Sequence, residues 1–294
     1  MTKGTIVKAL SGFYYVKTDD GQTYQCRGRG LFRKQKISPL VGDRVEIDIM
    51  DDGDGYVTKI EKRKNELIRP PVSNIEQAII VTSCLEPDFN ALLLDRFLVL
   101  VESKGIEPLI VISKMDLASE QVKNEMAKYQ SIYENMGYSV VLTSSKDEEL
   151  FRQLIPYIEG KSSVIAGQSG VGKSSLLNAL DPNLNIDTNH ISESLGRGKH
   201  TTRHVELIPL FNGLVADTPG FSSLDFREID SEKLPAYFPD MVAVQDDCKF
   251  RGCMHHKEPK CAVKAAVEKG QIPSFRYEHY LQFLEEIQIR KPRY

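Results

Sequence analysis

The stretch "SSVIAGQSGVGKSSLLNAL", residues 162–180, decides the fold. A short apolar run leads into "GQSGVGKS" at residues 167–174, and the chain then continues with a helical composition. A glycine-rich loop between a strand and a helix is the Walker pattern, in which backbone N–H groups surround phosphate oxygens. The stretch therefore predicts a phosphate-binding loop in an α/β domain whose sheet is covered by helices.

The residue types of this loop suit phosphate chemistry. Glycines let the backbone approach phosphate without a Cβ clash, and the helix N-terminus adds an anion site. Lys173 is expected to reach the outer phosphates, and the Ser174 hydroxyl is expected to bind Mg²⁺. The residues predicted to bind nucleotide here are Gly167, Gln168, Ser169, Gly170, Val171, Gly172, Lys173, Ser174 and Ser175.

Three more motifs follow apolar runs. "SKMD" at 113–116 follows "PLIVI", "TSS" at 143–145 follows "YSVVL", and "DTPG" at 217–220 follows "GLVA". The carboxyl ends of strands in an open α/β sheet border one crevice, where ligands bind. We therefore expect all four motifs to meet in one site, although "SKMD" precedes the phosphate loop in the chain.

Asp116 predicts which base is bound. Its carboxylate can accept hydrogen bonds from guanine N1–H and the 2-amino group, which adenine does not offer in that position. Lys114 would lay its stem across the ring. We expect the base side of a GTP site to consist of Ser113, Lys114, Met115, Asp116 and Ser144. An ATPase is the alternative that Asp116 opposes.

The segment "GRGKHTTRH", residues 196–204, has the composition of a mobile loop. A threonine there could bind Mg²⁺ only while the γ-phosphate is present. Thr202 is favoured over Thr201, because a Thr-Thr-Arg sequence with the second threonine as ligand resembles several bacterial GTPases. Asp217 is expected to hold Mg²⁺ through water, and Gly220 to turn its N–H toward the γ-phosphate.

Residues 1–68 contain five short β-rich runs separated by turn signals. They predict a small closed barrel of OB type, and periodicity leaves an SH3-like barrel open. The formal charge is +4 over residues 1–70, −8 over 71–225 and +1 over 226–294, which indicates domains with separate partners.

The basic segment "CRGRGLFRKQK", residues 26–36, is a candidate RNA contact. Phe32 could stack on a base or simply pack, and a solvated charged loop is the alternative for the whole segment. The basic residues expected to contact RNA phosphates are Arg27, Arg29, Arg33, Lys34 and Lys36.

The segment "CKFRGCMHHKEPKC", residues 248–261, brings three cysteines close to two histidines. The chain lacks an apolar run of transmembrane length and a signal peptide, so we expect a cytoplasmic, reducing location that favours metal over a disulfide. Three thiolates and one imidazole make a closed, structural zinc site. The candidate ligands are Cys248, Cys253, His255 and Cys261, and spacing alone leaves His256 as an alternative to His255.

The order of base-reading motif, "TSS", phosphate loop, threonine loop and "DTPG" is that of a circularly permuted GTPase. With a barrel before it and a Cys/His cluster after it, the chain resembles the RsgA family of ribosome-associated GTPases over essentially its whole length. The resemblance implies an OB-fold RNA-binding domain at 1–68, a permuted GTPase domain at 72–225 and a mostly helical zinc-binding domain at 226–294.

The same resemblance implies partners and roles. It implies a monomeric enzyme that hydrolyses GTP in late maturation of the small ribosomal subunit, binds that subunit and its rRNA, and is stimulated by it. It also favours His255 as the zinc ligand and His200 as a catalytic residue.

Two residues depart from common GTPase patterns. Ser113 stands where the base-reading motif usually has Asn, which removes one amide contact. Phe221 stands where Ras-like enzymes have the Gln that orients water, so intrinsic hydrolysis should be slow. A nucleotide-dependent RNA-binding adaptor without significant hydrolysis is therefore the alternative function.

Overall fold

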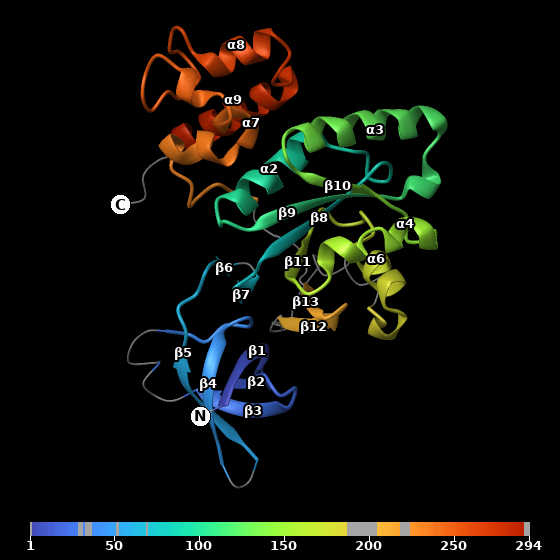
Figure 1. Ribbon diagram of the computed structural model, residues 1–294, viewed down its shortest axis with the longest axis vertical. Coiled ribbons are helices and arrows are strands. Elements are labelled where there is room, and N and C mark those ends of the chain that lie inside the picture. Colours follow the sequence, from blue (N-terminus) through green and yellow to red (C-terminus); the bar gives the residue numbers. More distant parts are fainter. Residues whose placement is uncertain are drawn as a thin grey trace.

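The computed structural model describes residues 2–28, 32, 37–50, 53–68, 70–186, 205–217 and 224–290. Figure 1 shows three successive regions: a barrel near the N-terminus, a sheet with helices on its faces, and a helical region near the C-terminus. Within the described residues, no helix combines the length and the apolar composition needed to span a membrane.

The N-terminal region is a closed five-stranded barrel. Its strands are β1 (Thr2–Leu10), β2 (Phe13–Thr18), β3 (Thr23–Gly28), β4 (Arg44–Ile49) and β5 (Gly55–Ile60). Strand β1 pairs with both β2 and β4, β3 pairs in parallel with β5, and β4 pairs with β5, which closes the ring. This arrangement is OB-like, as predicted, and the SH3-like alternative is set aside.

The barrel interior is filled by side chains that alternate along the strands. Those that are completely buried are Ile6, Val16, Cys26, Val45, Ile47 and Val57. Gly55 must be glycine, because a Cβ there would lie 2.7 Å from Cys26 Sγ. Phe32 is also buried against this core, so its ring packs inside the barrel and is not exposed for stacking on a base.

A short hairpin connects the barrel to the next region. Strands β6 (Glu66–Ile68) and β7 (Pro71–Ser73) pair antiparallel there. The fully buried Asp43 carboxylate holds this hairpin, because it accepts hydrogen bonds from Arg63 at 2.7 and 2.8 Å and from Ser73 Oγ at 2.6 Å.

The central sheet has the strand order β10-β9-β8-β11-β13-β12. Its strands are β8 (Gln77–Ser83), β9 (Glu107–Ser113), β10 (Ser139–Leu142), β11 (Ser162–Ala166), β12 (Glu206–Leu210) and β13 (Gly213–Asp217). The first five in that order are parallel, and β12 forms an antiparallel hairpin with β13. Alternate residues of β8 point to opposite faces, so Ile80 joins one buried cluster while Ile79 joins another.

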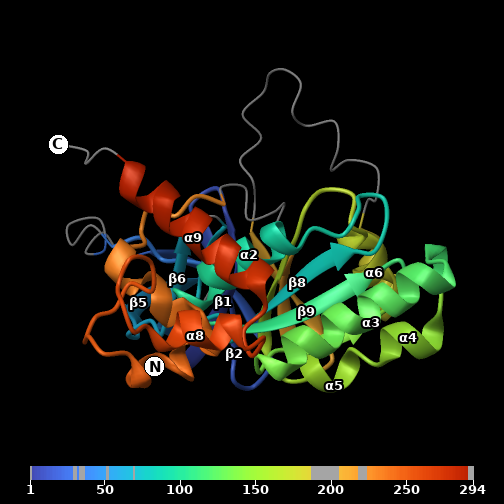
Figure 2. The ribbon, with the colours of Figure 1, turned by 90° about the horizontal axis from the view of Figure 1, so that it is seen from above.

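Helices cover both faces of this sheet (Figure 1, Figure 2). Helices α2 and α3 contribute Leu94, Phe97 and Met126 to the cluster on one face. Helix α6 and the segment around α4 and α5 contribute Leu154, Leu176 and Leu177 to the other. The helical bounds are α2 (Ala91–Glu102), η1 (Met115–Leu117), α3 (Glu120–Asn135), α4 (Glu148–Arg152), α5 (Ile155–Ile158), α6 (Lys173–Leu180) and η2 (Pro182–Leu184).

The barrel and the central sheet are joined edge to edge. Strand β1 pairs antiparallel with β12 at Lys8 and Glu206, so one continuous sheet of eleven strands runs through both regions. Lys8 Nζ also lies 2.8 Å from a carboxylate oxygen of Glu206.

The C-terminal region is helical and packs on α2. Its elements are η3 (Ser231–Tyr237), α7 (Pro239–Val242), η4 (Gln245–Asp247), α8 (Ala262–Glu268) and α9 (Ser274–Ile289). Their apolar cluster, which includes Phe226, Phe238 and Phe283, is shared with Val99 of α2.

A buried charged group lies at the same contact. Arg276 of α9 is completely buried, and its Nη1 lies 2.5 Å from Oδ1 of Asp95 of α2. Asp95 also accepts a hydrogen bond from Tyr133 and lies 2.6 Å from His279 Nδ1. Asp240 of α7 lies 3.5 Å from Arg276 Nε.

Candidate nucleotide site and metal centre

The strands that lead into the four motifs all end at one edge of the central sheet. Strands β9, β10, β11 and β13 run parallel, so Ser113, Leu142, Ala166 and Asp217 all end strands on the same side. This crevice at the carboxyl ends is where open α/β sheets bind ligands.

The phosphate loop adopts a conformation that only glycine permits. Gly167, Gly170 and Gly172 have φ angles of 137°, 83° and 93°. A Cβ on Gly167 would lie 2.1 Å from the carbonyl oxygen of Val81. Helix α6 then begins at Lys173 without a side-chain cap, which leaves its first N–H groups available for an anion.

Two polar side chains of the loop are nearly buried. Lys173 donates hydrogen bonds to the carbonyl oxygens of Gly167 at 2.9 Å and Gln168 at 2.8 Å. Ser174, in the first turn of α6, is 7% exposed, as is Lys173. The Lys173 ammonium is thus held beside the backbone of the loop that is predicted to receive the phosphates.

The base-reading motif is built around an ionised Asp116. Its Oδ1 accepts a 2.6 Å hydrogen bond from Ser144, and its Oδ2 lies 3.0 Å from Lys146 Nζ. Burial opposes ionisation of Asp116, but the hydrogen bonds from Ser144 and Lys146 outweigh it and lower the pKa of the carboxyl. The carboxylate is therefore an acceptor at neutral pH. The sequence analysis did not predict Lys146 as a partner of Asp116, although this cation directly follows "TSS" in the sequence.

The backbone also joins the two base-side motifs. Met115 N–H donates to the carbonyl of Thr143 at 3.1 Å, which aligns "SKMD" with "TSS". Lys114 has a left-handed φ of 62°, and its ammonium donates to the carbonyl oxygen of Glu86.

Ser113 has a role that the sequence analysis did not foresee. Its hydroxyl lies 2.6 Å from the carbonyl oxygen of Val171 in the phosphate loop and 3.0 Å from that of Thr82. Ser113 is 4% exposed, so this is a buried hydrogen bond between the base-reading motif and the phosphate loop. The missing Asn amide is therefore replaced by a short hydroxyl contact to the loop.

Several predicted residues cannot be placed in this geometry. His200, Thr202 and Gly220 lie outside the described residues, as does Phe221. Asp217 ends β13 at the expected edge. In the barrel, the RNA candidates Arg29, Arg33, Lys34 and Lys36 also lie outside the described residues, whereas Arg27 is exposed with its guanidinium 4.9 Å from the Phe13 ring centre.

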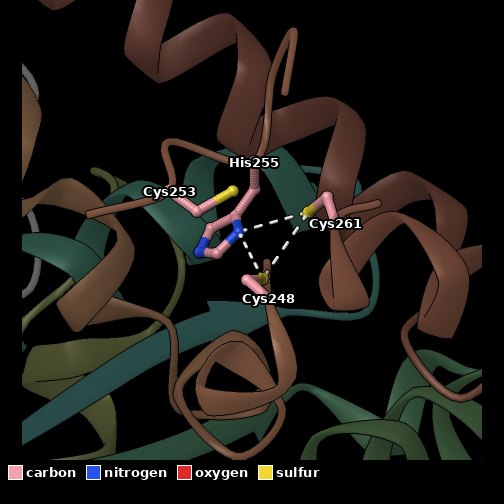
Figure 3. Close-up of side chains that lie close together, drawn as sticks. All are labelled: Cys248, Cys253, His255 and Cys261. Atoms are coloured by element: carbon pink, nitrogen blue, oxygen red, sulfur yellow. Dashed lines mark hydrogen bonds between the residues drawn. The ribbon is translucent and has the colours of Figure 1, made fainter. Parts of the chain in front are cut away.

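The Cys/His cluster is assembled as predicted (Figure 3). Cys248, Cys253, His255 and Cys261 place one ligand atom each within 4.8 Å of the others. His255 is buried with Nδ1 facing the thiols, whereas His256 is exposed and is not part of this group. Tyr277 and Tyr280 donate 2.6 Å hydrogen bonds to the carbonyls of His255 and Met254 and fix the loop from outside.

The distances suit a tetrahedral ion. Zinc bonds of about 2.3 Å to sulfur and about 2.0 Å to nitrogen imply about 3.8 Å between sulfurs and about 3.6 Å between sulfur and nitrogen. Cys248 and Cys261 sulfurs are 3.9 Å apart, and His255 Nδ1 is 3.7 and 3.3 Å from them. Burial, followed by the neighbouring thiols, raises the pKa of Cys253 to about 12, so a bound cation would be needed to hold the thiolate form of this side chain.

Comparisons with known proteins agree with these features. Residues 60–227 match the family described as RsgA GTPase, and residues 3–57 match RsgA N-terminal domain. "Small ribosomal subunit biogenesis GTPase RsgA 2" of Oceanobacillus iheyensis is 62% identical over 294 residues, with full coverage of both chains. The RsgA of Bacillus subtilis, with the same functional name, is 57% identical with full coverage of both chains.

Two solved structures have the same fold. YloQ, described as a circularly permuted GTPase, superposes with a TM-score of 0.87 at 52% identity, covering 100% of this chain and 97% of that one. YjeQ from Thermotoga maritima superposes with a TM-score of 0.88 at 37% identity, covering 99% of each chain.

Proposed function

The chain belongs to the RsgA family of GTPases, and from this premise we propose that it acts in late maturation of the small ribosomal subunit. It hydrolyses GTP to GDP and phosphate, and the subunit stimulates its turnover. It works as a monomer in the cytoplasm, where it binds the small subunit and its rRNA. The observation that carries this proposal is the meeting of Asp116 and the phosphate loop at one sheet edge, bridged by Ser113.

We propose the following division of the nucleotide site. Asp116 accepts the two guanine donors, Lys114 covers the ring, and Ser144 orients the carboxylate. The backbone of residues 167–175 and the N-terminus of α6 receive the phosphates, where Lys173 exchanges a loop carbonyl for a phosphate oxygen. Ser174 and Thr202 would bind Mg²⁺ directly, and Asp217 would hold the ion through a water molecule. The N–H group of Gly220 would turn toward the γ-phosphate.

Hydrolysis needs a polar group that Phe221 cannot provide. Phosphoryl transfer depends mainly on the positions and charges of the reacting groups, so a residue that orients the attacking water contributes a large part of the rate. His200 is our candidate for that group. Replacing His200 with Ala should therefore abolish most subunit-stimulated turnover and leave GTP affinity unchanged. Full stimulated turnover in that variant would remove His200 from the mechanism.

The nucleotide is proposed to set the orientation of the flanking regions. Strand β12 follows the threonine loop and pairs with β1 of the barrel. After "DTPG", the Leu224 carbonyl accepts a 2.9 Å hydrogen bond from Arg96, which also pairs with Glu286 of α9. Both γ-phosphate loops are thus mechanically connected to regions that can contact a partner. Equal subunit affinity with GDP and with a non-hydrolysable GTP analogue would contradict this coupling.

Two metal ions follow from the site chemistry. We propose one structural zinc on Cys248, Cys253, His255 and Cys261, with no position open for substrate. Mg²⁺ accompanies GTP. Barrel residues Arg27, Arg29, Arg33, Lys34 and Lys36 are proposed to contact rRNA phosphates, and this binding should weaken as salt increases.

The deciding experiment is phosphate release from GTP with and without purified small subunits. We expect slow release alone and strong stimulation by the subunit, with Lys173→Ala inactive in both conditions as the control. Nucleotide-dependent subunit binding without stimulated release would instead support the adaptor. Competition by ATP as strong as by GTP would contradict the role of Asp116.

A further inference from the structure

The loop that joins β8 to α2 contacts both the base side and the phosphate side of the nucleotide site. This segment, residues 84–90, is called the β8–α2 loop below. On the base side, the Lys114 ammonium donates a hydrogen bond to the carbonyl oxygen of Glu86. On the phosphate side, Pro87 Cδ lies 3.8 Å from the position that a Cβ on Gly170 would take, so the proline ring lies next to the phosphate loop.

The contact with Glu86 fixes the end of a long and flexible side chain. Lys114 Cε lies 4.0 Å from the position that a Cβ on Gly172 would take, so the stem of the lysine runs beside the phosphate loop. A lysine stem that is free in solution loses rotamer freedom when a ligand orders it. A stem that is already held at its ammonium loses less, and the ligand then binds more tightly.

Two side chains hold the β8–α2 loop in place. At its start, the hydroxyl of Ser83 donates a 2.6 Å hydrogen bond to the carbonyl oxygen of Pro87, and Ser83 is only 1% exposed. Near its end, the half-buried ring of Phe89 packs on Tyr129 of α3 with the ring centres 4.5 Å apart. The backbone that carries the Glu86 carbonyl is therefore anchored on both sides.

Cys84 ties the same loop to the backbone of the base-reading motif. Its thiol donates to the carbonyl oxygen of Lys114 at 3.1 Å, and its N–H group donates to the carbonyl oxygen of Ser113 at 3.1 Å. Burial raises the pKa of the Cys84 thiol above its ordinary value, so this side chain stays protonated and can donate. Lys114 is thus held by the loop at its ammonium and at its carbonyl group.

We propose that the β8–α2 loop positions Lys114 for guanine binding, by holding the lysine ammonium on the Glu86 carbonyl so that the stem is already in place to cover the base. This inference rests on the proposed function, since it takes Lys114 and Asp116 as the base-side residues. The loop acts through Lys114 and contacts no reacting group. It therefore contributes equally to the binding of GDP and GTP and leaves the chemical step unchanged.

The test removes the hydroxyl that anchors the loop. Ser83→Ala should weaken binding in a fluorescent-GDP titration by about 2- to 10-fold, the range expected for one hydrogen bond. Hydrolysis at saturating GTP should keep its rate, because only binding is affected. The matched control is Ser163→Ala, which removes another buried hydroxyl, 3.3 Å from Gln77 Oε1, near the amino end of β11. GDP affinity in Ser83→Ala equal to that of the unmodified chain and of this control would overturn the proposal.

A double-mutant cycle shows whether the loop acts through Lys114. Lys114→Ala leaves the loop with no side chain to position, so adding Ser83→Ala to it should weaken GDP binding by less than about 2-fold more. The full loss of Ser83→Ala in that background would show that the loop acts by another route and would refute the assignment. Phe89→Ala loosens the other end of the loop and should give the same two results, so it carries the test if Ser83→Ala does not fold.

The outcomes distinguish this inference from the proposed function. If the unmodified chain binds GDP no more tightly than ADP, the proposed guanine site itself fails. If the chain prefers GDP, but Ser83→Ala and Phe89→Ala bind it normally or keep their losses beside Lys114→Ala, only the assignment of the β8–α2 loop fails.

Discussion

Replacing Arg276 with Met should severely destabilise the contact between α9 and α2. Arg276 is completely buried beside Asp95 and Asp240, with its guanidinium 4.4 Å from the Phe238 ring centre. Methionine keeps much of the volume but removes the guanidinium that lies beside two buried carboxylates. Asp95 would retain Tyr133 and His279, whereas neither oxygen of Asp240 accepts a hydrogen bond from any described residue.

The expected loss follows from this arrangement. Removing one partner of a buried ion pair costs about 3–5 kcal/mol, because the remaining charge is left without compensation. That is a large part of a total stability of about 5–15 kcal/mol. Adding Asp240→Asn to Arg276→Met should recover part of the loss. The matched control is Arg290→Met at the end of the same helix, where the side chain is only partly buried and donates to the Ile229 carbonyl.

The assay is urea unfolding followed by circular dichroism on the zinc-loaded protein, with pH as a second variable. Burial raises the pKa of Asp240 above its ordinary value, although Arg276 works against this. Without Arg276 the pKa should rise further, so the destabilisation should be present at neutral pH and decrease as Asp240 takes up a proton on acidification. A loss below about 1 kcal/mol, or no recovery on adding Asp240→Asn, would refute this reasoning.

Three further predictions concern the nucleotide and metal sites. Asp116→Asn should weaken GTP binding by at least about 100-fold and improve binding of xanthosine triphosphate, because the new amide donates a hydrogen bond where guanine also donates. A fluorescent-nucleotide titration in which the variant and the unmodified chain bind GTP equally would contradict this role of Asp116. Ser113→Ala should lower the free energy of unfolding by about 1–3 kcal/mol, because the Val171 carbonyl would lose its hydrogen-bond donor, while Ser113→Asn should retain GTP affinity. An unchanged free energy of unfolding in Ser113→Ala would show that the contact is unimportant. Chelating zinc should unfold the C-terminal region, measured as new protease cleavage after residue 226, because the bound metal supplies the folding energy of that region. The same treatment should leave GDP binding intact. Resistance to proteolysis without metal would argue against a structural ion.

The sequence was sufficient to predict the elements whose signals are local. The phosphate loop, the other strand-end motifs and the metal cluster each depend on residue types at short spacing. The structure brings the strand ends before these motifs to one edge of the sheet, and it brings the four Cys/His side chains into a separate cluster. The closed barrel was also predictable from five short runs, although the choice between OB-like and SH3-like required the pairing of β3 with β5.

Long-range contacts were not predictable from those signals. Arg276 lies between Phe275 and Tyr277 in an apolar helical stripe, and Asp95 lies within "ALLLDRF". A charge inside an apolar run indicates an unusual site, but its partner lies far away in the chain and no periodicity connects the two. The Ser113 contact was missed for a similar reason, because the replacement of Asn suggested a loss and gave no indication of Val171 as a new acceptor.

The pairing of β1 with β12 has a consequence for dividing the chain. An unpaired strand edge presents free N–H and C=O groups that invite other chains to pair with it. A fragment that begins after the barrel would expose β12 as such an edge, next to the buried Leu207 and Leu210. The barrel therefore covers part of this edge, and we expect the isolated sheet region to aggregate more readily than the full chain even though its nucleotide motifs are all present.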